Sequence, residues 1–145
     1  MFYSLRKAEK NDLGAILEFV GQAGLSTEGL EEIIDQFVLL ENSDHKIVGC
    51  LGMEIIEQDG LLRSLVISNK MNQAHIVTLL QSIDFLKEQH HVQQIYLMAK
   101  NEASIRFLNI LGFKEINVQN TPDHVQKCHH VQQMLQNEEA ILMVK

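Results

Sequence analysis

The segment from Leu61 to Leu80 changes its hydrophobic period halfway along, and this change constrains the fold more than any other feature of the chain. Residues Leu61 to Ile67 are apolar and partly β-branched, which predicts a buried strand. A polar turn follows, from Ser68 to Gln73. From about Asn72 onward, apolar residues recur at the spacing of a helix, at Ile76, Leu79, Leu80, Ile83 and Leu86.

A strand that feeds a helix through a tight turn presents the free backbone N–H groups of the first helical turn at the end of a sheet. These groups and the positive end of the helix dipole both favour a negatively charged group. The segment therefore predicts an anion-binding site where residues 68–73 lead into the helix.

Hydrophobic periodicity also predicts the other elements of the chain. Strands are expected over residues 3–8, 37–41, 46–57, 94–99, 113–118 and 140–144, and helices over 13–22, 101–111 and 123–135, with a further helix after Ser26 or Thr27. Asn11 or Asp12 is expected to cap the first helix. Asp59-Gly60 predicts a hairpin turn between two antiparallel strands. The strand–helix–strand run from 61 to 99 predicts a parallel pair, so the fold class is α/β.

Length and charge limit the classes of function. The 145 residues predict one domain, over residues 1–145. The formal charge is −7 and no Lys/Arg cluster is visible, which argues against a nucleic-acid partner and for a small-molecule or protein partner. No apolar run approaches the ~18 residues of a membrane span. Charged residues from Arg6 to Lys10 interrupt any signal peptide, so a cytoplasmic protein with reduced Cys50 and Cys128 is expected.

Three groups of residues resemble the GNAT superfamily of N-acyltransferases. The first is Leu65-Val66-Ile67 with the lead-in Ser68 to Met71, which is similar to the strand before the family's glycine-rich turn. The second, Asn101 to Phe113 (NEASIRFLNILGF), keeps the Asn and the Gly-Phe of the pattern N-x-x-A-x-x-x-Y-x-x-x-G-F. The third comprises residues 23–32, 47–50 and 61–65, and is similar to small GNAT proteins related to N-acetylglutamate synthase. Together these matches cover nearly the whole chain.

The resemblance implies one GNAT-like domain with a mixed, twisted sheet flanked by helices. It implies that an acetyl group is transferred from acetyl-CoA, the cosubstrate, to an amine. It also implies that strands 61–67 and 94–99 splay apart at one end, where the pantetheine arm lies. A homodimer is compatible with the family.

The same resemblance assigns residues of the strand, the turn and the second motif to coenzyme A binding. They are Leu65, Val66, Ile67, Asn72, Gln73, Ala74, His75, Ile76, Val77, Asn101 and Ser104. The turn departs from the family's R/Q-x-x-G-x-G/A, since Asn72 replaces Arg or Gln, and Gln73, His75 and Val77 stand where glycines are usual. Glycine lets a backbone approach phosphates closely, whereas Val77 is β-branched and stiff.

Acetylation of an amine needs a base, or a chain of water molecules, to remove a proton from the ammonium group. Glu54 and Glu57 are the candidates, and Glu57 is expected to be solvated near the hairpin turn. By alternation Glu54 shares a strand face with Cys50 and Gly52, and a carboxylate among apolar neighbours can act as a base near neutral pH. The alternative is that Glu54 simply faces water. Leu108 replaces the tyrosine that many family members use as general acid, so that role is empty or left to solvent.

Arg63 lies inside an apolar strand, so its guanidinium is expected to pair with a carboxylate. A neighbouring glutamate such as Glu54 is the simpler partner. The carboxylate of an amino-acid acceptor is the functional alternative, which makes Arg63 the candidate substrate-binding residue. No metal site is predicted, because the adjacent residues Cys128-His129-His130 lack the spacing of metal ligands on a helix. Cys50 is expected to be inert packing in mid-strand.

Two hypotheses follow for the function. The first is acetyl-CoA-dependent N-acetylation of a small amine or amino acid by direct transfer, with Glu54 as the catalytic base. Arg63 and Asn101 also favour it, because an amphipathic helix over 101–111 does not by itself explain Asn101. The second is a non-catalytic protein of the same fold that binds a ligand or a partner, which the missing glycines and Leu108 favour.

Overall fold

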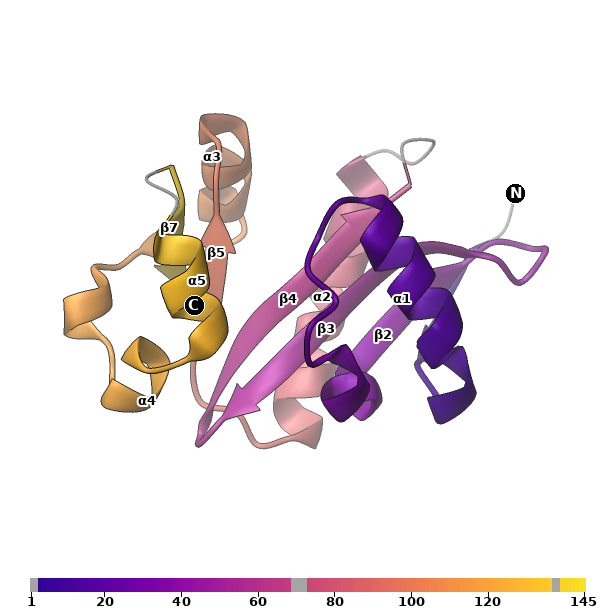
Figure 1. The fold of residues 1–145 in the computed structure, drawn as a ribbon. Coiled ribbons are helices and arrows are strands. Elements are labelled where there is room, and N and C mark those ends of the chain that lie inside the picture. Colours follow the sequence, from indigo (N-terminus) through magenta and orange to yellow (C-terminus); the bar gives the residue numbers. More distant parts are fainter. Residues whose placement is uncertain (1–2, 69–72, 137–138) are drawn as a thin grey trace. The chain divides into compact units, whose positions relative to one another are not determined.

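The computed structural model describes residues 3–68, 73–136 and 139–145 (Figure 1). The strands are β1 (Ser4–Lys7), β2 (Phe37–Glu41), β3 (Ile47–Ile56), β4 (Asp59–Ile67), β5 (Ile95–Ala99), β6 (Lys114–Glu115) and β7 (Ile141–Val144). The α-helices are α1 (Leu13–Gln22), α2 (Gln73–Gln89), α3 (Glu102–Ile110), α4 (Asp123–Gln126) and α5 (His129–Leu135), and the 3-10 helices are η1 (Lys10–Asp12), η2 (Leu30–Gln36) and η3 (Val118–Asn120).

The seven strands form one mixed sheet in the order β1-β2-β3-β4-β5-β7-β6. Strands β4 and β5 are parallel, with Gly60 opposite Ile95 and Leu61 opposite Tyr96. The β1-β2, β2-β3, β5-β7 and β6-β7 pairs are antiparallel. This confirms the predicted α/β class with a mixed sheet flanked by helices. Contacts divide the chain into two compact units, residues 1–54 with 63–90 and residues 55–62 with 91–145.

In the first unit, helices cover both faces of the strands (Figure 1). The core on the side of α1 and η2 is built from buried residues of both helices and of β2, β3 and β4: Ile16, Val20, Leu30, Ile33, Ile34, Phe37, Leu39, Cys50 and Val66, with Ala8. On the other face α2 approaches β3 closely, since a Cβ atom on Gly49 would lie 3.0 Å from Cδ1 of Leu79. Because Gly49 has no side chain, the apolar face of α2 can lie this close to the sheet.

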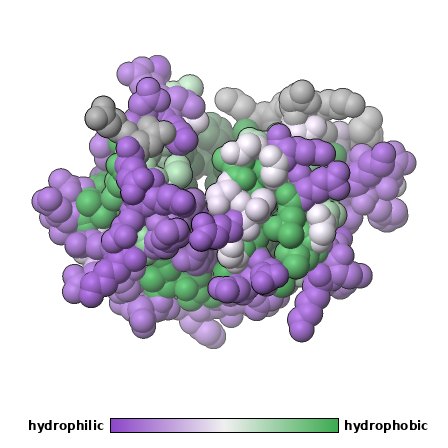
Figure 2. Space-filling model, in the orientation of Figure 1, coloured by the Kyte–Doolittle hydropathy of each residue, from purple (hydrophilic) through white to green (hydrophobic). Residues whose placement is uncertain are grey.

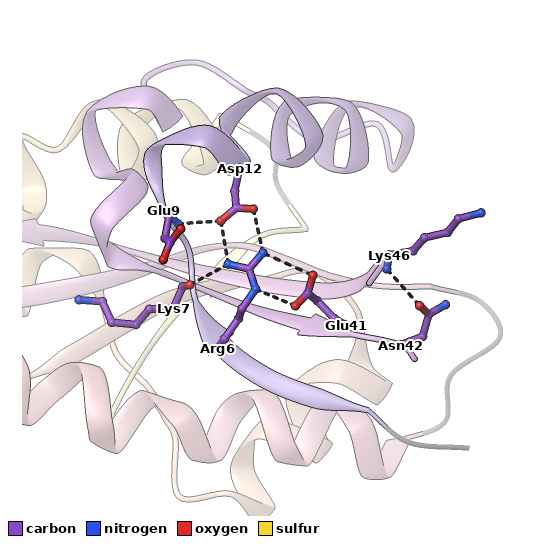
Figure 3. A network of polar contacts seen from close by, with 7 residues as sticks. All are labelled: Arg6, Lys7, Glu9, Asp12, Glu41, Asn42 and Lys46. Atoms are coloured by element: carbon purple, nitrogen blue, oxygen red, sulfur yellow. Dashed lines mark hydrogen bonds and ion pairs between the residues drawn. The ribbon is translucent and has the colours of Figure 1, made fainter. Parts of the chain in front are cut away.

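Arg6 on the edge strand β1 organises a polar network in the first unit (Figure 3). Its guanidinium donates to both carboxylate oxygens of Asp12, each at 2.8 Å, and to Oε1 of Glu41 at 2.7 Å. The Glu9 backbone N–H donates to Asp12 Oδ2 at 2.7 Å. These bonds join β1, η1 and β2, and they hold the pKa of Asp12 below its ordinary value, chiefly through the hydrogen bond from Arg6.

In the second unit, a buried carboxylate is held by two hydrogen bonds. Asp59, the first residue of β4, is only 2% exposed. Its Oδ2 lies 2.6 Å from Nε2 of His124 on α4, and its Oδ1 accepts from the Gln94 backbone N–H at 3.1 Å. The apolar core of this unit contains Leu61, Tyr96, Val125, Cys128, Val131 and Leu142. Burial, and to a smaller extent the charge of Asp59, raise the pKa of Tyr96.

The structure corrects the predicted hairpin turn and the predicted first cap. Glu57 has a left-handed φ of 56° and forms the turn with Gln58, whereas Asp59 and Gly60 already belong to β4. The hydrogen bonds to His124 and Gln94 account for the difference, because they hold the carboxylate of Asp59 inside the fold. Asp12 does stand at the start of α1, but its side chain makes no cap hydrogen bond there and binds Arg6 instead.

Three further elements are shorter than the sequence predicted. The helix after Ser26 begins at Leu30, behind Gly29 in a left-handed conformation, and is a 3-10 helix. The strand expected over 113–118 keeps only Lys114–Glu115, because Asn117 caps η3 through the Gln119 N–H. The helix expected over 123–135 breaks into α4 and α5 at Cys128, whose ψ of 127° is extended.

Hydrophilic residues cover much of the face shown in Figure 2, with hydrophobic residues showing between them. Among the described residues, no helix combines the length and the apolar composition that crossing a membrane requires.

The Arg6 network predicts an acid-sensitive contribution to stability. Because the folded state depresses the pKa of Asp12, this contribution is present above about pH 4, the ordinary range of an aspartate, and is lost as pH falls through the folded pKa. Asp12→Asn is expected to lower the free energy of unfolding at pH 7 by about 1–2 kcal/mol. The variant should also lose less stability than the native protein between pH 5 and pH 2, measured by urea unfolding at each pH.

Asp44→Asn is the matched control, since Asp44 is an exposed aspartate in the turn after β2. It should leave both the stability at pH 7 and its pH dependence nearly unchanged. An equal effect of the two substitutions would contradict the assignment to the Arg6 network.

Candidate functional site

Strand β4 contains a break in its regular backbone at Ser64. This residue has a φ of 59°, a left-handed conformation that a non-glycine residue rarely adopts in a strand. Its carbonyl oxygen accepts a hydrogen bond from Sγ of Cys50 at 3.2 Å. A single left-handed residue in a strand locally disrupts the ladder and redirects the neighbouring backbone groups, as a β-bulge does. The backbone from Leu65 to Ile67, which was predicted to bind coenzyme A, follows directly.

Arg63 and Glu54 lie together on the α1/η2 side of this break. Nη1 of Arg63 donates to Oε1 of Glu54 at 3.0 Å, and Nη2 donates to the Glu28 carbonyl oxygen at 3.1 Å. The Arg63 side chain is 7% exposed and that of Glu54 is 28% exposed. The structure therefore confirms the simpler of the two predicted partners of Arg63. Glu54 lies beside a cation as well as beside the apolar residues of its strand.

The predicted phosphate turn is described from Gln73, the first residue of α2, while Asn72 lies outside the described residues. His75 packs edge-on against Tyr3, with ring centroids 4.8 Å apart. Ala74 is exposed, and Ile76 and Val77 are half-buried. The helix extends for 17 residues behind this turn, so its dipole is fully developed at the position where the sequence predicts an anion.

Asn101 and Ser104 lie in the second unit and interact with each other. Asn101 is the N-cap of α3, and its side chain accepts a hydrogen bond from the Ser104 backbone N–H at 2.8 Å. Helix capping thus accounts for Asn101, which the amphipathic pattern alone did not explain. Both residues are exposed. Leu108, at the position of the family's tyrosine, is a buried residue and offers no proton.

Cys50 on β3 is fully buried. Burial raises the pKa of its thiol to about 12, so it is neutral at physiological pH and is no nucleophile. This confirms the expectation of an inert cysteine. Glu57 is exposed in the hairpin turn, also as expected. Among the described residues, no three His, Cys, Asp or Glu side chains gather in a way that could hold a metal ion.

Sequence reasoning did not anticipate the break at Ser64 or the burial of Asp59 beside His124. Ser64 carries no strand-breaking signal, because a serine is common in exposed strands. A polar residue between Arg63 and Leu65 was the only available hint. The Asp59–His124 pair joins residues separated by 65 positions, and neither residue type indicates its partner.

The fold is that of known acetyltransferases. A GNAT-family acetyltransferase from Staphylococcus aureus Mu50 matches 99% of this chain and 98% of its own, at 15% identity and a TM-score of 0.78. The N-acetylglutamate synthase of Neisseria gonorrhoeae, solved with coenzyme A and N-acetyl-glutamate, matches the whole chain at 21% identity and a TM-score of 0.78. The present chain spans 35% of the length of that synthase. The protein therefore has the GNAT acetyltransferase fold along its whole length.

Family membership follows from a relative of higher sequence identity. The uncharacterized protein YwlB of Bacillus subtilis is 44% identical over 146 residues, an alignment that covers 100% of this chain and 98% of YwlB. No protein-family model matches the chain. The chain belongs to the same family as YwlB.

The burial of Cys50 predicts an alkaline loss of stability. Its folded pKa of about 12 lies above the ordinary value of 9.0, so the unfolded chain loses the proton first as pH rises. The contribution of the thiol is complete below about pH 9 and falls by up to about 1.4 kcal/mol per pH unit above it. Urea unfolding of the native protein and of Cys50→Ala between pH 8 and pH 10.5 should show a steeper loss for the native protein.

Other groups that titrate in this range are present in both proteins, so the difference between the two slopes isolates the thiol. Parallel slopes would contradict the burial of a neutral thiol. An independent check is thiol labelling at pH 8, in which Cys50 should remain unmodified until the protein is unfolded.

Proposed function

We propose that the protein is an acetyl-CoA-dependent N-acetyltransferase that acts on a small amine or amino acid by direct transfer. The observation that carries the proposal is the left-handed Ser64 in the middle of β4, in a chain that has the GNAT fold along its whole length. The synthase of N. gonorrhoeae, solved with coenzyme A and N-acetyl-glutamate, supports coenzyme A as the ligand and an amino acid as a candidate acceptor.

Backbone groups are proposed to hold most of the cosubstrate. The segment Leu65 to Ile67 follows the break in β4 and supplies N–H and C=O groups for the pantetheine arm. The start of α2, comprising Gln73, Ala74, His75, Ile76 and Val77, is proposed to face the pyrophosphate, because the N-terminus of a long helix favours an anion. Asn72, outside the described residues, stays a prediction for the same role. Asn101 and Ser104 at the start of α3 are proposed as further contacts.

Glu54 is proposed to accept the proton that an ammonium acceptor must lose before it can attack. Acetyl-CoA supplies the acyl group: the amine nitrogen bonds to the thioester carbon, the carbon–sulfur bond breaks, and the thiolate takes a proton from solvent. Leu108 cannot donate that proton. The Glu54 side chain is 28% exposed, which leaves part of it open to an incoming amine.

Arg63 is the cation that the carboxylate of an amino-acid acceptor would meet. Its Nη1 and Nη2 already donate to Glu54 and to the Glu28 carbonyl, so the acceptor would have to replace one of these partners. An amine without a carboxylate would leave both bonds in place. Comparing amino acids with their decarboxylated amines therefore tests which class the site prefers.

A non-catalytic role is the second candidate. The observations that favour it are the half-buried Val77 near the start of α2, in place of a glycine, and the buried Leu108 in place of a proton donor. A GNAT-fold protein of this kind would bind a ligand or a protein partner without turnover.

Calorimetric titration with acetyl-CoA, followed by a thiol-release assay over a panel of amines and amino acids, separates the two candidates. Saturable binding together with acceptor-dependent release of coenzyme A is expected for the enzyme. Binding without release by any acceptor would favour the non-catalytic role, and no binding at millimolar acetyl-CoA would exclude the cosubstrate.

Glu54→Gln tests the proposed base. Turnover is expected to fall by about 10²- to 10⁴-fold, the usual contribution of a general base. Affinity for acetyl-CoA, measured by calorimetry, should change little, because the amide oxygen can still accept the hydrogen bond from Arg63. Glu57→Gln is the control, since Glu57 is an exposed glutamate in the adjoining turn. Turnover that survives Glu54→Gln would remove this residue from the mechanism.

Replacing both Gln73 and Val77 by glycine tests the phosphate turn. Removing two side chains lets the backbone approach the pyrophosphate more closely, so the dissociation constant for acetyl-CoA should fall. Gln81→Gly, an exposed position farther along α2, controls for the general cost of glycine in a helix of about 1 kcal/mol. A gain in affinity in the double variant alone is expected. No gain would mean that this turn does not hold phosphates.

A further inference from the structure

The Arg63 side chain is a deeply buried cation in the strand that carries the candidate site. It is 7% exposed, and burying a cation is unfavourable unless charged and polar partners replace water. Glu54 supplies the countercharge, and the Glu28 carbonyl accepts a second hydrogen bond. The buried Nε has no hydrogen-bond partner among the described residues. Arg63 is therefore held almost entirely by two contacts, one to a strand and one to a loop.

The loop contact joins segments far apart in sequence. Glu28 belongs to the connection between α1 and η2, which contains two left-handed glycines, Gly24 with φ of 79° and Gly29 with φ of 78°. The backbone hydrogen bonds from Leu30 N–H to the Thr27 carbonyl and from Glu32 N–H to the Gly29 carbonyl are local. The bond from Arg63 instead spans 35 positions and ties this loop to β4.

The same guanidinium touches the other parts of the candidate site. Nη1 holds the carboxylate of Glu54, and a Cβ atom on Gly29 would lie only 3.9 Å from it. The next residue along the strand is Ser64, where the backbone is left-handed. One side chain thus links the loop to the proposed base, and it belongs to the residue that directly precedes the break in β4.

We infer that Arg63 is a positioning residue: it clamps the α1–η2 loop to β4 and fixes the carboxylate of Glu54 beside the break at Ser64. For an acceptor without a carboxylate, its effect on acetyl transfer is exerted through Glu54. The part of this inference that concerns catalysis rests on the proposed function, whereas the clamp does not.

Hydrogen exchange of the full chain tests the clamp without any substrate. In Arg63→Gln, amides of residues 24–29 should exchange at least tenfold faster, while amides of α2 keep their native rates. Arg106→Gln is the matched control, because Arg106 forms an exposed i,i+4 pair with Glu102. It should leave the exchange of residues 24–29 unchanged. Unchanged exchange of this loop in Arg63→Gln would overturn the clamp.

Kinetics test the positioning of Glu54 by a double-mutant cycle. Arg63→Gln is expected to lower kcat at least tenfold with the KM for acetyl-CoA changed less than threefold. In a Glu54→Gln background, the same substitution should lower kcat less than twofold further. Equal losses of kcat in both backgrounds would show that Arg63 does not act through Glu54 and would overturn the inference. Arg63→Lys, which keeps the charge but reaches one partner, should recover part of kcat.

If Arg63→Gln does not fold, both experiments are carried out on Arg63→Lys, since lysine keeps a positive charge beside Glu54. If no acceptor gives turnover in the native protein, the proposed function fails and the clamp is decided by hydrogen exchange alone. Faster exchange confined to residues 24–29 would then support the clamp, and uniform loss of protection over the first unit would overturn it.

Discussion

Burial of the Arg63 cation in β4 is the interaction on which the candidate site depends. Charge removed from water must be compensated where it lies, and here Glu54 and the Glu28 carbonyl provide the compensation. The loop before η2, the carboxylate on β3 and the backbone at Ser64 are consequently not independent. A change that removes one of these partners leaves the buried guanidinium uncompensated, which lowers the free energy of unfolding. Breaking an ordinary surface ion pair has no comparable cost.

The comparison with Arg6 shows what burial adds. Arg6 bridges two carboxylates and, like Arg63, joins elements distant in sequence, yet its side chain is 36% exposed. Water can replace part of its network, so the network fastens the edge strand and lowers the pKa of Asp12 without constraining other groups. Arg63 lies inside the strand that carries the break at Ser64, and its contacts restrict the segments around the candidate site.

The fold could be predicted from the sequence where the periodicity was strong. The strands β2 and β7 and the helices α1 and α2 were predicted to within about two residues, because apolar residues run continuously in these strands and recur at helical spacing in these helices. The Asp-Gly pair predicted a turn at Asp59. The prediction was wrong because the residues that bind its buried carboxylate, His124 and Gln94, are distant in sequence. The break at Ser64 depends on φ, which serine does not dictate. Arg63 and Glu54 could be paired in advance, since an arginine in an apolar strand demands a carboxylate.

The departures from the family pattern affect side chains, whereas the proposed contacts to the cosubstrate are mainly made by the backbone. A left-handed residue in β4 and the N-terminus of a 17-residue helix do not depend on which side chains flank them. His75 and Val77, where glycines are usual, are therefore expected to keep the backbone farther from the phosphates and so to weaken the binding of acetyl-CoA. Leu108 bears on the departing thiolate, a group that water can protonate. Under the proposed function, loss of the glycines and of the tyrosine hydroxyl lowers affinity or rate without removing the proposed base, so acetyl transfer requires that an amine reach Glu54.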